Sequence, residues 1–173
     1  WTSLTSTASN KPQSFVNTFD YVNNVIVNPL NGYVFVSGVY GLRRSKDGGT
    51  TWDSLLDSEA LNAYYTEITM NSKGVLYAAL SSRGIFRSAD NGDTWTDITP
   101  SSFSVVGRTV IGHAPSDENT MYVISYSSST SHPLWKYTYS SGDGSGSNGT
   151  WTDLSLNIPA FGGRVGDFDS QGG

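Results

Sequence analysis

A pattern of eight residues occurs twice and constrains the fold more than any other feature of the sequence. Ser-x-Asp-x-Gly-x-Thr-Trp is found at residues 45–52 and again at residues 88–95, an offset of 43 residues. The similarity extends beyond the pattern, because Gly-Leu-Arg-Arg precedes the first copy and Gly-Ile-Phe-Arg precedes the second. Trp-x-x-(Leu/Ile) occurs four times, starting at Trp1, Trp52, Trp95 and Trp151. This periodicity predicts a structural unit that repeats about every 43 residues.

Each repeat contains four short segments typical of β-strands, separated by turns rich in Gly, Asn, Ser and Pro. The composition agrees: Gly (19) and Tyr (10) are abundant, and only 14% of the residues are charged, which does not favour long helices. The expected strands cover residues 24–27, 33–36, 42–45 and 51–55, then 66–70, 75–80, 85–88 and 94–98, then 109–112, 121–126, 134–139 and 150–154.

Four strands in about 40–45 residues is the size of a β-propeller blade. The sequence therefore predicts an all-β fold, a β-propeller segment of about three four-stranded blades with partial blades at both ends. Because propellers close with about four to eight blades, we expect the rest of a larger polypeptide or a partner chain to complete the ring. The expected units are residues 1–7 (last strand of a preceding blade), 8–56 and 57–100 (blades with the pattern), 101–157 (a blade with a degenerate copy) and 158–173 (start of a following blade).

The repeated pattern has a mechanical explanation as a turn between two strands. Gly49 and Gly92 supply positive φ without steric cost, and the carboxylates of Asp47 and Asp90 can accept hydrogen bonds from turn amides. The alternative is that these carboxylates are catalytic or bind Ca²⁺, but two copies on different blades cannot converge on one substrate. The residues assigned this structural role are Ser45, Asp47, Gly49, Thr51, Trp52, Ser88, Asp90, Gly92, Thr94 and Trp95.

The segments GLRRSKDGGTTW and GIFRSADNGDTW resemble the Asp-box (BNR) repeats of sialidases, sortilin-type receptors, xyloglucanases and secreted bacterial surface proteins. The resemblance implies a β-propeller whose boxes lie at the periphery of the blades, opposite the ligand face. It does not fix a chemistry, since many functions share this fold. The catalytic sialidases of this group also need an Arg-Ile-Pro motif, which does not occur in this sequence. The resemblance further implies a location outside the cell, either secreted or at the cell surface.

The ends of the innermost strands converge around the channel of a propeller, so residues far apart in sequence become neighbours there. Tyrosine rings beside charged groups suit carbohydrate, whose C–H faces stack and whose hydroxyls need fixed partners. The alternative is that these tyrosines line a polar channel and the charges are solvated. The residues expected on this face are Tyr21, Tyr40, Tyr64, Tyr65, Glu67, Arg83, Arg108, Arg164 and Asp167.

Composition argues against several other classes of protein. The net charge of −5, with only ten scattered Lys and Arg residues, argues against a nucleic-acid surface. The two histidines, His113 and His132, have no metal-like spacing, so we expect neither a metal site nor a cofactor. Cysteine is absent, and no apolar run approaches the length of a membrane span.

Three functional classes are compatible with these observations. The first is a binding or adhesion propeller for a carbohydrate or protein ligand. The second is part of a glycoside hydrolase, sialidase-like or xyloglucanase-like, whose remaining catalytic residues lie outside this chain. The third is a purely structural module.

Overall fold

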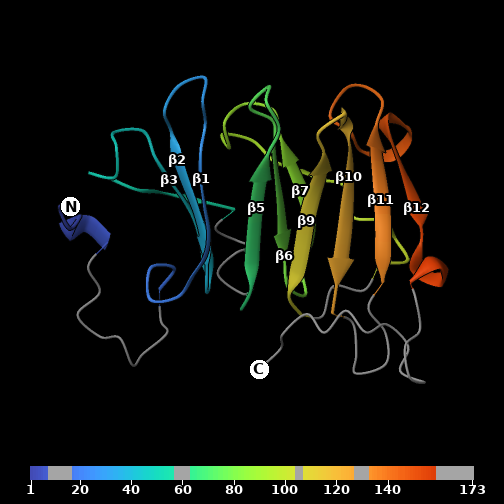
Figure 1. Cartoon of the computed structure of the whole chain (residues 1–173), viewed down its shortest axis with the longest axis horizontal. Coiled ribbons are helices and arrows are strands. Elements are labelled where there is room, and N and C mark those ends of the chain that lie inside the picture. Colours follow the sequence, from blue (N-terminus) through green and yellow to red (C-terminus); the bar gives the residue numbers. More distant parts are fainter. Residues whose placement is uncertain (8–16, 57–62, 104–106, 127–132, 159–173) are drawn as a thin grey trace.

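Three four-stranded antiparallel sheets, referred to as blades 1, 2 and 3, make up the computed structural model, which describes residues 1–7, 17–56, 63–103, 107–126 and 133–158. They follow one another along the longest axis of the molecule, from blue to red (Figure 1). Blade 1 contains β1 (Val22–Val27), β2 (Val34–Gly38), β3 (Gly41–Ser45) and β4 (Asp53–Leu55). The strands pair in sequence order, as they do in every blade.

Blades 2 and 3 repeat the same topology. Blade 2 contains β5 (Thr66–Met70), β6 (Leu76–Leu80), β7 (Gly84–Ser88) and β8 (Thr96–Asp97). Blade 3 contains β9 (Thr109–Ala114), β10 (Asp117–Ser125), β11 (Leu134–Tyr139) and β12 (Gly149–Asp153). The only helices in the described ranges are three short 3-10 helices, at Thr5–Thr7, Gly146–Asn148 and Ser155–Asn157. The expected all-β arrangement of three four-stranded units is confirmed.

The main differences from the sequence-based prediction are at residues 1–7 and in blade 3. Residues 1–7 were expected to form the last strand of a preceding blade, but they contain no strand, and Thr5–Thr7 is a 3-10 helix. A strand needs a neighbouring strand for its hydrogen bonds, and no described residue pairs with this segment in a sheet. In blade 3, β10 begins at Asp117 instead of residue 121, because Asp117 pairs with Ala114 ahead of a bulge. The expected start of a further blade at residues 158–173 lies, apart from residue 158, outside the described residues.

The apolar core lies between the blades. Strand β6 is buried along its whole length, and alternate side chains point to opposite sides of it. Leu76, Ala78 and Leu80 belong to the apolar cluster shared with blade 1, whereas Tyr77 and Ala79 belong to the cluster shared with blade 3. A central blade therefore needs apolar residues at consecutive positions, which explains the continuous run Leu-Tyr-Ala-Ala-Leu.

Contacts between adjacent blades repeat with the period of the sequence. The innermost strands β1, β5 and β9 contact each other in that order. Between β1 and β5, the side chains of two consecutive asparagines replace a backbone ladder: Asn23 Nδ2 donates to Thr66 O (2.9 Å) and Asn24 Nδ2 to Ile68 O (3.1 Å). These two bonds join the innermost strands of blades 1 and 2 near the start of β5.

Candidate functional site

The two repeated turns have the same internal hydrogen bonds. In the first, Ser45 Oγ donates to Asp47 Oδ1 (2.8 Å) and accepts from the amide of Gly49 (2.7 Å). In the second, Ser88 Oγ bonds to Asp90 Oδ1 (2.7 Å) and to the amide of Gly92 (2.8 Å) in the same way. Both serines are buried. Each serine hydroxyl thus links the carboxylate to the backbone of its own turn.

Each carboxylate also binds the threonine at the end of its turn. Asp47 accepts the Thr51 amide at Oδ1 (2.8 Å) and the Thr51 hydroxyl at Oδ2 (2.7 Å), and Asp90 accepts the same two groups of Thr94 (2.9 and 2.5 Å). These bonds lower the pKa of Asp47 to about 2. At Asp90 burial acts in the opposite direction, but the bonds from Thr94 and Ser88 outweigh it and the pKa is also lowered. The carboxylates therefore act as internal acceptors within their turns.

The glycines of these turns have the positive φ that the pattern predicts. Gly49 has φ = 94° and Gly92 has φ = 86°, a region that side chains disfavour. A Cβ at either position would also approach a neighbouring leucine, 2.6 Å from Leu4 at Gly49 and 3.2 Å from Leu55 at Gly92. Glycine is thus required at each position for two reasons: the backbone conformation and the close approach of an adjoining segment.

The turns also connect adjacent blades. Arg44 of blade 1 is buried and donates to Asn91 O (2.7 Å) and Asp93 Oδ1 (2.7 Å) in the turn of blade 2. In blade 2, Arg87 reaches Asp143 O of blade 3 (3.3 Å) in the same way. Sequence analysis identified the Arg at these positions as part of the repeat but did not predict its role as a bridge between blades.

The tryptophans of the two turns are partly buried rather than fully enclosed. Trp95 Nε1 donates to Gly92 O of its own turn (3.1 Å), so the indole folds back over the turn as expected. Trp52 Nε1 instead donates to Ser6 Oγ (3.3 Å), and the ring contacts Phe19 edge-on at 5.0 Å. In the degenerate third copy, Trp151 Nε1 donates to Ile98 O of blade 2 (2.6 Å).

Three tyrosines of the expected ligand face form one cluster. Tyr40 lies in the turn between β2 and β3, and Tyr64 and Tyr65 precede β5. The ring of Tyr64 contacts Tyr40 edge-on at 5.4 Å and Tyr65 edge-on at 4.7 Å. Tyr64 itself is 43% exposed. Blades 1 and 2 together therefore present an aromatic surface at the end of the sheet where β5 begins.

A polar group drawn from all three blades lies next to this cluster along β5. Glu67, two residues after Tyr65, is buried, and its Oε1 accepts from Asn24 Nδ2 of blade 1 at 2.9 Å. Burial raises the pKa of Glu67, although the bond from Asn24 and the charge of Arg108 in blade 3 act in the opposite direction. The sequence prediction included Glu67 and Arg108 but missed Asn24. A polar residue in an innermost strand, at the position equivalent to Glu67, is the signal that could have identified it.

The structure describes two of the other four residues expected on this face. Tyr21 is exposed and directly precedes β1, and Arg83 is exposed in the turn between β6 and β7. Arg164 and Asp167 lie outside the described residues, so their expected place on this face is not tested. Within the described part of the chain, His, Cys, Asp and Glu side chains form no group of three that could hold a metal ion.

Acidification is expected to weaken the fold as the two turn carboxylates become protonated. Because the folded pKa of Asp47 is about 2, against an ordinary value of 3.8, the stability that it contributes is fully present above the ordinary value and is lost as the pH falls toward 2. Asp90 acts in the same direction. Thermal unfolding between about pH 5 and pH 2 should therefore show a smaller pH dependence in Asp47→Asn and Asp90→Asn than in the native chain. An unchanged pH dependence in both variants would contradict this assignment.

Comparison with known proteins identifies the fold through solved structures. No protein-family model matches the sequence, and no curated protein matches it significantly. The structure is similar to the GH74 xyloglucanase from Xanthomonas campestris, with a TM-score of 0.56 and 17% identity over 83% of this chain and 24% of that one. A GH74 enzyme of Niastella koreensis gives a TM-score of 0.52 and 20% identity over 78% of this chain and 22% of that one. The chain is a partial β-propeller.

This partial propeller spans about a quarter of the length of the two GH74 enzymes that it resembles. At 17% and 20% identity the similarity establishes the fold alone. A search of the described residues for a helix long and apolar enough to cross a membrane finds none.

Proposed function

We propose that this partial propeller belongs to a secreted or cell-surface binding module whose ligand is a carbohydrate. The observation that carries the proposal is the tyrosine cluster of Tyr40, Tyr64 and Tyr65 beside the buried Glu67. An exposed aromatic ring next to fixed polar groups is the combination that recognises a sugar ring, which offers an apolar C–H face and a rim of hydroxyls.

The polar group supplies directional contacts that the tyrosines cannot. Glu67 has one carboxylate oxygen bound to Asn24, and Arg108 is close enough to lower its pKa. Arg108 itself is only partly buried and carries donors suited to hydroxyl groups. Because these residues come from three blades, the site depends on the relative positions of the blades as well as on the side chains.

The similarity to a xyloglucanase supports a polysaccharide ligand, although at this identity it supports the fold more directly than the ligand. A second candidate function, a contribution to glycoside hydrolysis, is favoured by the raised pKa of Glu67. A carboxyl group that stays protonated at higher pH is suited to act as a general acid. Hydrolysis needs a second carboxyl group, which under this alternative would be supplied by residues outside the chain.

Alanine substitution on this face is expected to weaken glycan binding. Tyr64→Ala removes one stacking surface and Arg108→Ala removes one charge-assisted donor, so each should reduce affinity by roughly 5- to 30-fold. We suggest an array of xyloglucan, sialylated and other glycans, followed by calorimetry with the best ligand. Tyr122→Ala, on an exposed tyrosine of β10, serves as the matched control and should bind like the native chain.

The same experiment separates the three functional classes. Binding without new reducing ends supports the binding module, whereas new reducing ends support the hydrolase. Binding that survives both Tyr64→Ala and Arg108→Ala would show that this face is not the ligand site. A complete absence of glycan binding by the full-length protein would favour a protein ligand or a purely structural module.

A further inference from the structure

An apolar face of blade 1 is exposed where the equivalent faces of blades 2 and 3 are buried. Val25, Ile68 and Ile111 occupy the same place in their inner strands, since they pair with Val36, Ala78 and Val123 of the second strands. Ile68 is 0% exposed and Ile111 is 7% exposed, because each is covered by the preceding blade. Val25 is 55% exposed.

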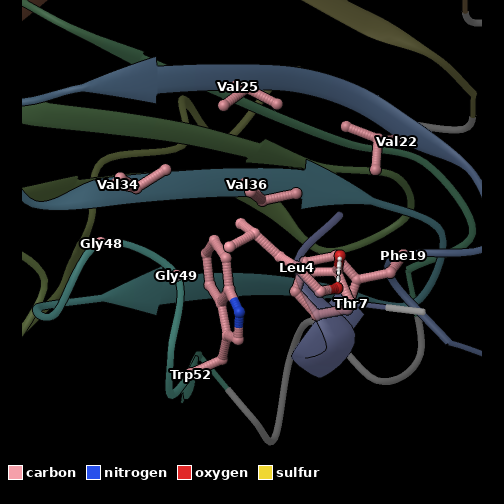
Figure 2. A pocket seen from close by; sticks show the side chains of 10 residues that line it. All are labelled: Leu4, Thr7, Phe19, Val22, Val25, Val34, Val36, Gly48, Gly49 and Trp52. Carbon is pink, nitrogen blue, oxygen red and sulfur yellow. Dashed lines mark hydrogen bonds between the residues drawn. The ribbon is translucent and has the colours of Figure 1, made fainter. Parts of the chain in front are cut away.

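The side chains on this side of blade 1, among them the exposed Val22 and Val25 and the buried Val36, line a cavity of about 280 Å³. Figure 2 shows Val22 and Val25 on β1 and Val34 and Val36 on β2, with Leu4 and Trp52 beside them. Val34 and Val36 correspond to Leu76 and Ala78, which pair with Met70 and Ile68 of β5 and are buried against blade 1. Blade 1 therefore has the apolar face of a blade that follows another blade.

Residues 1–7 already make part of the contact that a preceding blade would make. Leu55, in the fourth strand of blade 1, lies against Gly92 in the turn of blade 2. Leu4 lies against Gly49 in the turn of blade 1 in the same way, and Ser6 Oγ donates to Gly49 O. Leu4 and Leu55 also occupy the same position in the Trp-x-x-(Leu/Ile) pattern. Residues 1–7 thus lie where the outer part of a blade would lie, although they pair with no described strand.

We infer that the exposed face of blade 1 is an interface for three strands of a blade of the same repeat, with residues 1–7 at the outer edge of that blade. Its chemistry follows from the two internal interfaces. The second strand of this partner should present an aromatic ring, as Phe35 and Tyr77 do, and its third strand an aliphatic side chain, as Leu42 and Ile85 do. An arginine at the position of Arg44 and Arg87 should reach the turn at residues 45–52.

The inference can be tested by adding three strands of this repeat before residues 1–7. A copy of residues 17–51 placed directly before Trp1 restores the Thr-Trp of the turn and supplies three strands ahead of residues 1–7. The native chain has no cysteine, so Val25→Cys gives a single thiol whose labelling rate reports its burial. Ile68→Cys is the matched control, because the equivalent side chain is already buried by blade 1.

In the native chain we expect Val25→Cys to react at least tenfold faster than Ile68→Cys. In the extended chain both should react slowly. Equally fast labelling of Val25→Cys in the two chains would overturn the inference, as would loss of folding in the extended chain, seen as fast labelling of Ile68→Cys. Slow labelling of Val25→Cys in a native chain that light scattering shows to be a dimer would mean that a second copy occupies this face. Slow labelling in a monomer would mean that the chain covers it by itself.

Discussion

Phe35→Ala is expected to lower the free energy of unfolding by about 3–5 kcal/mol, one of the two largest effects that we expect from a single substitution. Phe35 is 0% exposed and belongs to the cluster that joins blades 1 and 2, together with Leu42 and Leu55. Removing its ring leaves a cavity between two sheets whose relative position is fixed by other contacts, so the cavity cannot collapse fully. Chemical denaturation monitored by tryptophan fluorescence would measure the loss.

Val27→Ala is the control for Phe35→Ala. Val27 lies on the neighbouring strand β1 and is largely exposed, so its truncation should change stability by less than about 0.5 kcal/mol. Similar losses in the two variants would mean that the interface between blades 1 and 2 is not the main source of stability in this part of the fold. The comparison also tests whether the face of blade 1 that carries Phe35 is buried and the face that carries Val27 is exposed.

Asp90→Ala should cost about 1.5–3 kcal/mol, because one substitution removes the acceptor for three hydrogen bonds. The amide and hydroxyl of Thr94 and the hydroxyl of Ser88 all donate to this carboxylate. Water can replace the acceptor at Thr94, which is exposed, but not easily at Ser88, which is buried. The loss of stability should therefore be smaller than the sum expected for three buried hydrogen bonds. Asp90→Asn keeps one oxygen acceptor, so it should lose less stability than Asp90→Ala.

Lys46→Ala is the matched control within the repeated turn. Lys46 stands at a variable position of the pattern, and the second copy has Ala89 there. Among the described residues, its side chain makes a long ion pair with Asp93, at 3.9 Å, and a distant contact with the ring of Tyr33. We expect almost no change in the melting temperature. A loss equal to that of Asp90→Ala would show that the fixed and variable positions of the turn do not differ in their structural role.

The sequence predicted best those features that depend on nearby residues. Strands were expected from short apolar segments between turn residues, and the observed strands lie at those places, although β8 contains only two residues. The hydrogen bonds of Asp47 and Asp90 and the positive φ of Gly49 and Gly92 were also predicted, because each turn closes within about seven residues.

Contacts between blades were harder to predict, because they join residues that are far apart in sequence. The bridge from Arg44 to Asp93 and the bond from Asn24 to Glu67 span 49 and 43 residues. The repeat suggests that such pairs are neighbours, but their side-chain directions depend on how one sheet is stacked on the next. For the same reason the strand expected in residues 1–7 was wrong, since pairing requires a partner strand as well as a suitable segment.

The sequence alone determined the repeating unit, its four strands and the residues that close its turns, because these depend on local backbone preferences and on the alternation of side chains along a strand. Only the tertiary structure decided which sheet faces are covered. Leu76–Leu80 has apolar side chains on both faces because it lies between two blades, whereas Val25 occupies the same place as the buried Ile68 and is exposed. The convergence of Asn24, Glu67 and Arg108 was decided in the same way, because burial and proximity arise from the stacking of the sheets.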